Sequence, residues 1–351
     1  MRVAIDVTPL VSGNTGVARY ARELLNGLRA RDDVDVTAFA VGRGPEVEPS
    51  IRRVRVPLRI VQRGYRHVHW PRAETFVGPA DLVHAIDIVP PATRAPLVIT
   101  IHDVLPILLP EQYAARQRMM IEAQLRAAPS AQLVVTTCEA TAEEIVRHTR
   151  VSREQLLVAP LGHREIAPTE PPAPYDEPYV LAVGALTPRK GFHHLVAAMQ
   201  QLGADAPLLV LVGPDGWESE VIHASAAALP AGRVRIEGYA SDDRLEALYR
   251  HATVLCHPSE AEGFGIPVLE AMAYGTPVVA ADIPPVREIG GDAVLLVPPR
   301  APAALASAIR SVVGDPERQR LMSERGRTRA EPFTWSRFTE LVVEGYRRVV
   351  G

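Results

Sequence analysis

Two adjacent cations, Arg189 and Lys190, lie in the segment Thr187-Pro188-Arg189-Lys190-Gly191, and Lys190 is the one lysine among 38 basic residues. The ammonium of a lysine is a compact point charge on a flexible stem, whereas the guanidinium of an arginine is a planar fork, so the two groups bind a phosphate with different geometry. The flanking sequence predicts a buried strand before this segment and a helix after it. Cations in such a strand-to-helix turn favour binding of a polyanion. The alternative is that one surface lysine has survived by chance in an arginine-biased chain.

A second segment, residues 259–277, combines carboxylates with the signals of a helix start. Gly263 and Gly265 predict a flexible turn, Pro267 suits the first position of a helix, and Gly275 suits its end. The helix is therefore expected over about 267–274. Its N-terminus would carry partial positive charge and unpaired N–H groups, which together attract a phosphate.

Two glutamates, Glu262 and Glu270, are separated by seven residues in this segment. We expect Glu262 on the loop and Glu270 on the first helical turn. Their carboxylates could accept hydrogen bonds from sugar hydroxyls beside the phosphate. A capping box at Ser259 and Glu262 is the structural alternative, but the glycines that follow at once argue against a helix there.

Composition indicates a soluble globular protein of two domains, with 351 residues, 47% hydrophobic and 23% charged. Cys138 and Cys256 lie at or near the ends of apolar runs and are interpreted as buried residues of a reducing compartment. The chain starts at once with a strand over 2–7, which predicts no signal peptide, and no apolar stretch reaches membrane-spanning length. We therefore expect a cytoplasmic location.

Residues 51–73 contain seven arginines and no acid, with Tyr65 and Trp70 interleaved among aliphatic side chains. This mixture suits an anionic membrane surface at the inner face of the membrane. The net charge of −3 for the whole chain makes nucleic acid an unfavoured partner. The alternative is a solvated strand and helix face whose arginines pair elsewhere.

Short apolar strands alternate with amphipathic helices along the whole chain, which predicts an α/β protein with parallel sheets covered on both faces. Expected strands are 2–7, 34–41, 52–56, 81–85, 97–101, 132–137, 156–159, 179–184, 208–213, 233–237, 252–256, 277–280 and 293–296. Expected helices are 16–31, 111–128, 139–148, 191–201, 216–229, 241–251, 267–274, 301–313 and 335–350.

A proline-rich stretch, 166–178, is interpreted as a linker between two doubly wound, Rossmann-like domains. The first domain is expected over 1–165 and the second over 179–334, with the last helix, 335–351, packing back on the first. Ligands of such sheets bind beyond the carboxyl ends of the strands, so a central cleft between the domains is the expected site.

Taken together, the chain resembles the family 4 glycosyltransferases, which are retaining, use nucleotide-sugars and have the two-domain GT-B fold. The resemblance is carried by Pro188-Arg189-Lys190-Gly191 and by the run from Glu262 to Glu270. It extends to nearly the whole chain, including Val183-Gly184, Val212-Gly213 and Glu237-Gly238-Tyr239. It implies a metal-independent hexosyltransferase that passes sugar from a nucleotide-sugar to a saccharide or lipid-linked saccharide.

The resemblance also implies roles for particular residues. Arg189 and Lys190 would neutralise the donor diphosphate, Glu262 would hold the transferred sugar, and Glu270 would hold the ribose hydroxyls. Other positions implied to bind the donor, through backbone or close packing, are Gly16, Gly184, Tyr239, Gly263, Phe264, Gly265 and Leu269. The loop Gly13-Asn14-Thr15-Gly16 has separated glycines where the family has an adjacent pair, and an ordinary turn is the alternative there.

The run from Thr100 to Pro106, with Pro110-Glu111 beyond, resembles the version found in bacterial mannosyltransferases of surface polysaccharides. His102 follows a predicted buried strand and would contact the sugar as its positive charge develops; a core or capping histidine is the alternative. Mannose from GDP-mannose is the resulting donor hypothesis. His163, His193 and His194 have no comparable setting.

The departing diphosphate needs charge compensation, which a metal held by an Asp-x-Asp motif often supplies. The one such triplet, Asp33-Val34-Asp35, falls at a helix-to-strand turn on the side of the first sheet opposite to the expected site. We therefore expect neither metal nor other cofactor, with Arg189, Lys190 and a helix dipole in their place. A glycosyl phosphorylase on the same scaffold and a noncatalytic nucleotide-sugar-binding subunit remain as alternatives.

Overall fold

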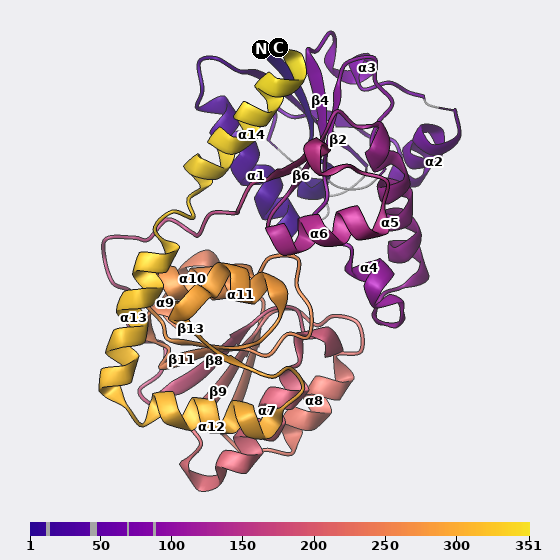
Figure 1. The fold of residues 1–351 in the computed structure, drawn as a ribbon. Coiled ribbons are helices and arrows are strands. Elements are labelled where there is room, and N and C mark those ends of the chain that lie inside the picture. Colours follow the sequence, from indigo (N-terminus) through magenta and orange to yellow (C-terminus); the bar gives the residue numbers. More distant parts are fainter. Residues whose placement is uncertain (12–14, 43–47, 69, 87–88) are drawn as a thin grey trace. The chain divides into compact units, whose positions relative to one another are not determined.

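The computed structural model describes residues 1–351 except 12–14, 43–47, 69 and 87–88. The chain forms two compact units (Figure 1). Unit 1 comprises residues 1–162 and 333–351, and unit 2 comprises residues 163–332. Each unit is built on one parallel sheet, as the alternation of apolar strands and helices predicts.

Unit 1 contains a seven-stranded sheet in the order β3-β2-β1-β4-β5-β6-β7. Every neighbouring pair is parallel. The strands are β1 (Arg2–Asp6), β2 (Asp35–Val41), β3 (Arg52–Val54), β4 (Leu82–Ala85), β5 (Leu97–Thr100), β6 (Leu133–Thr136) and β7 (Leu156–Val158). The order reverses between β1 and β4, which is the switch point of a doubly wound sheet.

The helices of unit 1 include all three that the sequence predicts before residue 162. They are α1 (Gly16–Arg29), α2 (Leu58–Val68), α3 (Glu74–Val77), α4 (Leu105–Leu108), α5 (Ala115–Ala127), α6 (Glu139–His148) and α14 (Trp335–Val350). Short 3-10 turns are η1 (Thr8–Val11), η2 (Pro110–Gln112), η3 (Ala128–Ser130) and η4 (Arg153–Gln155). The sequence analysis missed α2, α3 and α4. Helices α3 and α4 have only four residues each, and α2 lies in the arginine-rich stretch 51–73 that is interpreted from the sequence as a basic surface.

The last helix, α14, belongs to unit 1, where it lies beside α1 (Figure 1). A buried polar chain holds it there: Oη of Tyr346 lies 2.6 Å from Nδ1 of His84, and Nε2 of that histidine lies 2.8 Å from Oγ1 of Thr100. Thr100 in turn bonds Oη of Tyr20 on α1, at 2.8 Å. Burial lowers the pKa of His84 to about 3, so its ring stays neutral in the folded protein.

Unit 2 contains a six-stranded parallel sheet in the order β10-β9-β8-β11-β12-β13. The strands are β8 (Tyr179–Val183), β9 (Leu208–Val212), β10 (Val234–Gly238), β11 (Val254–His257), β12 (Val278–Ala281) and β13 (Val294–Val297). The helices are α7 (Phe192–Leu202), α8 (Glu220–Ala227), α9 (Asp242–His251), α10 (Ile266–Tyr274), α11 (Pro284–Gly290), α12 (Pro302–Val313) and α13 (Pro316–Ala330). Short 3-10 turns are η5 (Pro188–Lys190), η6 (Gly203–Asp205) and η7 (Gly291–Ala293).

Unit 2 begins at His163. The proline-rich stretch 166–178, which is interpreted from the sequence as a linker, therefore belongs to unit 2. One anchor is His251, whose Nε2 lies 2.8 Å from the carbonyl oxygen of Pro171. The C-terminal boundary of unit 2 is at Pro332, slightly before the expected end of the second domain at residue 334. Among the helices described in either unit, none combines the length and hydropathy that a membrane crossing requires.

Candidate active site

The carboxyl ends of β8 and β11 define the candidate site of unit 2. These strands are hydrogen-bonded neighbours, and the strand order reverses between them. In doubly wound sheets this switch point opens a crevice in which ligands bind. The two strands are followed by Gly184 and by the loop from Pro258 to Gly265, so two of the predicted segments meet at this crevice.

Gly191 allows the predicted cation pair to approach this loop. Its φ is +67°, a left-handed conformation that glycine adopts without strain. A Cβ at this position would lie only 2.2 Å from the carbonyl oxygen of Pro258. Next to this close approach, the N–H of Glu260 donates to the carbonyl oxygen of Arg189 at 2.9 Å. Backbone packing thus fixes the turn η5 against the loop after β11.

Lys190, Arg189 and Glu262 form an ion cluster within unit 2. Nζ of Lys190 lies 2.6 Å from Oε1 of Glu262, and Nη1 of Arg189 lies 3.6 Å from Oε2 of the same carboxylate. Arg189 also donates to the carbonyl oxygen of Ala261. Burial would raise the pKa of Glu262, but the charges of Lys190 and Arg189 and the contact with His257 hold it well below its usual value. The carboxyl group is therefore ionised at neutral pH.

His257, the last residue of β11, is a site residue that the sequence analysis missed. Its side chain is almost fully buried, and Nε2 lies 3.1 Å from Oε1 of Glu262, outside hydrogen-bond alignment. Burial lowers the pKa of His257, and the nearby carboxylate opposes that effect only in part. Oγ of Ser259 is also buried and makes no hydrogen bond with any residue that the structure describes. Unsatisfied buried polar atoms beside a charged cluster are typical of a site that receives a polar ligand.

Helix α10 starts directly after these residues, as its turn signals predict. Gly265 caps it with a φ of +112°, where a larger side chain would be strained, and it offers no side chain to cap the helix. Phe264 is buried, which anchors the loop, and Gly263 links it to Glu262. The N–H of Leu269 donates to the carbonyl oxygen of Gly265 at 3.2 Å. To contact a phosphate as predicted, the same N–H would have to donate to the phosphate and to this carbonyl at once.

Glu270 lies on α10, but as its fifth residue. The expectation that it lies on the first turn is wrong, because the helix begins at Ile266 and its first turn is complete before Glu270. The side chain is only 3% exposed and accepts a hydrogen bond of 2.8 Å from Nε of Arg164. Arg164 also donates to Asp242 on α9. The buried carboxylate of Glu270 is thus paired and oriented by an arginine from the stretch after β7.

Arg164 was not found in the sequence because its partners are 106 and 78 residues away. No local spacing encodes such a contact, and it becomes visible only when the chain is folded. Two other predicted donor positions lie at strand ends of this unit. Gly184 has a φ of +151°, and a Cβ there would lie 3.2 Å from Cε of Lys190. Tyr239 follows β10 and is 59% exposed.

His102 and Gly16 belong to unit 1 and are described within that unit alone. Nε2 of His102 lies 3.1 Å from the carbonyl oxygen of Ile86, and its ring meets that of Tyr20 edge-on at 4.7 Å. Burial lowers the pKa of His102 to about 4, so the ring is neutral near pH 7. Gly16 is the first residue of α1, and Thr15 caps this helix by accepting from the N–H of Ala18.

Two further sequence predictions concern unit 1. The glycine loop Gly13-Asn14-Thr15-Gly16 lies partly outside the described residues, which omit 12–14. Asp33, of the one Asp-x-Asp triplet, lies before the amino end of β2 and pairs with Arg31 and Arg347. Ion pairing lowers the pKa of Asp33 to about 2. His102 instead follows the carboxyl end of β5, so the triplet and the histidine lie at opposite ends of the sheet.

Two doubly wound sheets, each with a switch point of the kind at which ligands bind, place the chain in the class of two-domain α/β proteins. Two family models match this chain: Glycosyltransferase Family 4 over residues 14–163, and Glycosyl transferases group 1 over residues 163–329. The chain belongs to family 4 of the glycosyltransferases, has the GT-B fold and is a glycosyltransferase enzyme.

Among its curated relatives is O-antigen chain mannosyltransferase B of Escherichia coli, which is 27% identical over 99% of this chain and 100% of the relative. Among solved structures, sucrose-phosphate synthase of Thermosynechococcus elongatus is 25% identical, with a TM-score of 0.79 over 99% of this chain and 98% of the other. Anabaena HepE, solved in complex with UDP and glucose, shares the fold, with 20% identity and a TM-score of 0.76 over 99% and 100% of the two chains.

Proposed function

We propose that this enzyme transfers a hexose from a nucleotide-sugar to a saccharide or lipid-linked saccharide, with retention of anomeric configuration and without a metal. The observation that carries the proposal is the cluster of Lys190, Arg189 and Glu262 at the switch point of unit 2. Two cations and one carboxylate leave one positive charge in excess, which suits a diphosphate. The adjacent N-terminus of α10 adds backbone N–H groups and a favourable dipole.

Glu262 forms an ion pair with Lys190. When the diphosphate arrives, the ammonium can turn to the phosphate oxygens, and the carboxylate is then available for sugar hydroxyls. Two unit charges about 4 Å apart interact by roughly 4 kcal/mol at a surface-like dielectric. If this attraction is gained mainly as the leaving group becomes more negative, one cation can accelerate transfer by about two to three orders of magnitude.

The reaction breaks the bond between the anomeric carbon and the diphosphate oxygen, and the electron pair leaves with the diphosphate. An acceptor hydroxyl forms a bond to the same carbon from the same face. Its proton passes to the departing phosphate oxygen, so no protein base is needed. Arg189 and Lys190 stabilise the diphosphate as its charge grows, and Glu262 orients the sugar. In unit 1, His102 has a neutral ring at pH 7 and is the residue that we propose for contact with a sugar.

Mannose carried by GDP is the donor that we favour. The support is the segment around His102 and the relative in Escherichia coli, which is an O-antigen chain mannosyltransferase. Glu270 would accept hydrogen bonds from the ribose hydroxyls. Its buried carboxylate is held in place by Arg164, which fixes the direction in which the carboxylate can accept them. The acceptor would be a growing surface polysaccharide or its lipid-linked precursor.

A membrane-facing surface in unit 1 fits a lipid-linked acceptor. On and near α2, Ile60 and Trp70 are 63% and 65% exposed. Arg55 and Arg63 are also exposed and make no ion pair with any residue that the structure describes. Val61, the next residue on α2 after Ile60, is buried. Exposed apolar side chains beside unpaired guanidinium groups support peripheral binding to an anionic inner membrane face.

The purified chain should be incubated with GDP-mannose, GDP-glucose, UDP-glucose and dTDP-glucose in separate reactions, with a lipid-linked saccharide as acceptor. We expect the fastest transfer with GDP-mannose. NMR of the product should show an α-linkage when the donor is α-linked. Binding of donor without transfer would favour a noncatalytic subunit. Release of sugar 1-phosphate only when inorganic phosphate is added would favour a phosphorylase.

A further inference from the structure

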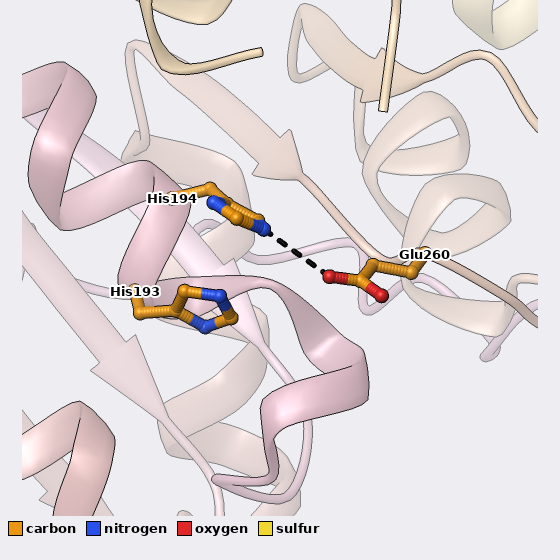
Figure 2. Close-up of side chains that lie close together, drawn as sticks. All are labelled: His193, His194 and Glu260. Atoms are coloured by element: carbon orange, nitrogen blue, oxygen red, sulfur yellow. Dashed lines mark hydrogen bonds and ion pairs between the residues drawn. The ribbon is translucent and has the colours of Figure 1, made fainter. Parts of the chain in front are cut away.

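A second cluster of functional side chains lies beside the candidate active site in unit 2. His193 and His194 lie on the first turn of α7, and Glu260 lies in the loop after β11. One potential ligand atom from each residue lies within 4.8 Å of the others. Figure 2 shows the ring of His194 directed at the carboxylate of Glu260, with His193 next to it. The proposed transfer reaction uses none of these three residues.

We propose that His193, His194 and Glu260 form a binding site for a divalent transition-metal ion of the zinc class. Two imidazoles and one carboxylate are a donor set that zinc accepts, with a further position left for water. In a tetrahedral shell of about 2.0–2.2 Å, neighbouring ligand atoms are roughly 3.3 Å apart. Nε2 of His194 lies 3.1 Å from Oε1 of Glu260, so these two atoms are already spaced as ligands of one ion.

A ring nitrogen of His193 is available beside the other two residues. Nδ1 of His193 is buried and makes no hydrogen bond with any described residue. Nε2 of His194 is hydrogen-bonded to Oε1 of Glu260, so an ion bound between these two atoms would replace that hydrogen bond.

Arg300 is the competitor for this site. Its Nη2 lies 2.6 Å from Oε2 of Glu260, the oxygen that does not face His194. The guanidinium group leaves Oε1 for an ion, yet it withdraws negative charge from the carboxylate and so weakens metal binding. This competition gives the proposal a distinctive consequence, because removal of Arg300 should improve the site.

Ion binding would join the start of α7 to the loop that carries Glu262. Glu260 is two residues from Glu262, and its N–H already donates to Arg189. The ion would therefore stabilise the arrangement of the donor-binding loop without contacting the donor. Because its ligands include two imidazoles, the site should prefer Zn²⁺ or Co²⁺ over Mg²⁺. The test of metal binding does not measure glycosyl transfer, so the two proposals can succeed or fail separately.

The test is a calorimetric titration of the EDTA-stripped, dialysed full-length chain with Zn²⁺ alone. We expect saturation at one equivalent, at least about tenfold weaker binding in His194→Gln and in Glu260→Gln, and several-fold tighter binding in Arg300→Gln. His223→Gln is the matched control, because that histidine pairs with Asp215 elsewhere in unit 2 and its loss should leave the affinity unchanged. Circular dichroism without metal checks that each variant is folded.

Titration with Co²⁺ adds a readout of the ligands themselves. A four-coordinate site should give strong visible absorption that disappears in His193→Gln and His194→Gln. Absence of saturable Zn²⁺ binding would overturn the proposal, and so would equal affinity in wild type and His194→Gln. Unchanged affinity in Arg300→Gln would show that Zn²⁺ binds elsewhere, which also overturns it.

Discussion

Lys190 and Glu262, 72 residues apart in the chain, meet at the switch point of unit 2 with 2.6 Å between Nζ and Oε1. The lysine side chain also packs against Gly184, where a Cβ would lie 3.2 Å from Cε of Lys190. An ammonium on a narrow aliphatic stem therefore fits this position closely. A wider, planar guanidinium group would have to displace its neighbours.

Lys190→Arg should lower kcat by at least about tenfold, although the positive charge is kept, because the planar group cannot take the same place against Gly184. Arg233→Lys, at a surface pair with Glu177 in the same unit, is the matched control and should leave kcat unchanged. Steady-state kinetics with saturating donor and acceptor give the comparison. Full turnover in Lys190→Arg would contradict a specific role for the ammonium of Lys190.

Glu270→Ala should raise the KM for the nucleotide-sugar more than it lowers kcat, because the proposed ribose contact persists from ground state to transition state. Arg164→Met should act in the same direction, since it leaves the buried carboxylate of Glu270 without its partner. Loss of kcat with an unchanged donor KM in Glu270→Ala would contradict the ribose role. Both variants need a melting curve to show that they are folded.

Much of the fold follows from local sequence signals, because apolar runs and glycine or proline stops are written within a few residues. All thirteen predicted strands and all of the predicted helices lie close to their expected positions, but α11 and the long helix α13 were not predicted. The helix end at Gly275 is confirmed, with a left-handed cap. The predicted turn containing Lys190 and the loop containing Glu262 are brought together in the structure.

What the sequence could not provide are the contacts that depend on tertiary packing. Arg164 reaches Glu270 from a stretch that prolines mark only as a linker. His257 looks like an ordinary strand end until its ring is seen beside Glu262. His193 and His194 have no local metal motif, because their third partner, Glu260, follows a different strand. For Arg164 and for the two histidines of α7, the partner side chain is far away in the sequence, and for His257 the contact depends on how the loop after β11 folds back.

Unit 1 should lose stability in mild acid through His84. Its folded pKa is about 3, below the unfolded value of about 6.5, so protons bind preferentially to the unfolded state below pH 6.5. The loss grows as pH falls from 6.5 toward the folded pKa. At pH 5.0 it amounts to about 2 kcal/mol relative to neutral pH, from 1.36 kcal/mol per pH unit.

His84→Gln should therefore be less stable than wild type at pH 7.5 but should lose less on acidification to pH 5.0. Urea unfolding can be followed by fluorescence in a Trp217→Phe background, where the remaining tryptophans, Trp70 and Trp335, both belong to unit 1. Equal acid sensitivity of the two proteins would show that the ring of His84 is accessible to protons in the folded state.

The exposed surface on and near α2, which includes Ile60 and Trp70, should bind anionic vesicles. Vesicles that contain phosphatidylglycerol should sediment with the wild type, and vesicles of phosphatidylcholine alone should not. Ile60→Ser combined with Trp70→Ser should weaken this binding about tenfold or more, since both side chains are mostly exposed and would enter the interface. The matched control is Leu321→Ser, at an exposed apolar position of unit 2. Sedimentation of the double variant with undiminished affinity would mean that another surface binds lipid.

The most direct measurement of the central claim is the initial rate of sugar transfer in excess EDTA, compared with the rate after addition of Mg²⁺ or Mn²⁺. If Arg189, Lys190 and the N-terminus of α10 neutralise the diphosphate, transfer should continue in EDTA and change less than about twofold with either ion. Loss of transfer in EDTA with recovery in Mg²⁺ would contradict the account, because a divalent ion would then be the group that binds the diphosphate.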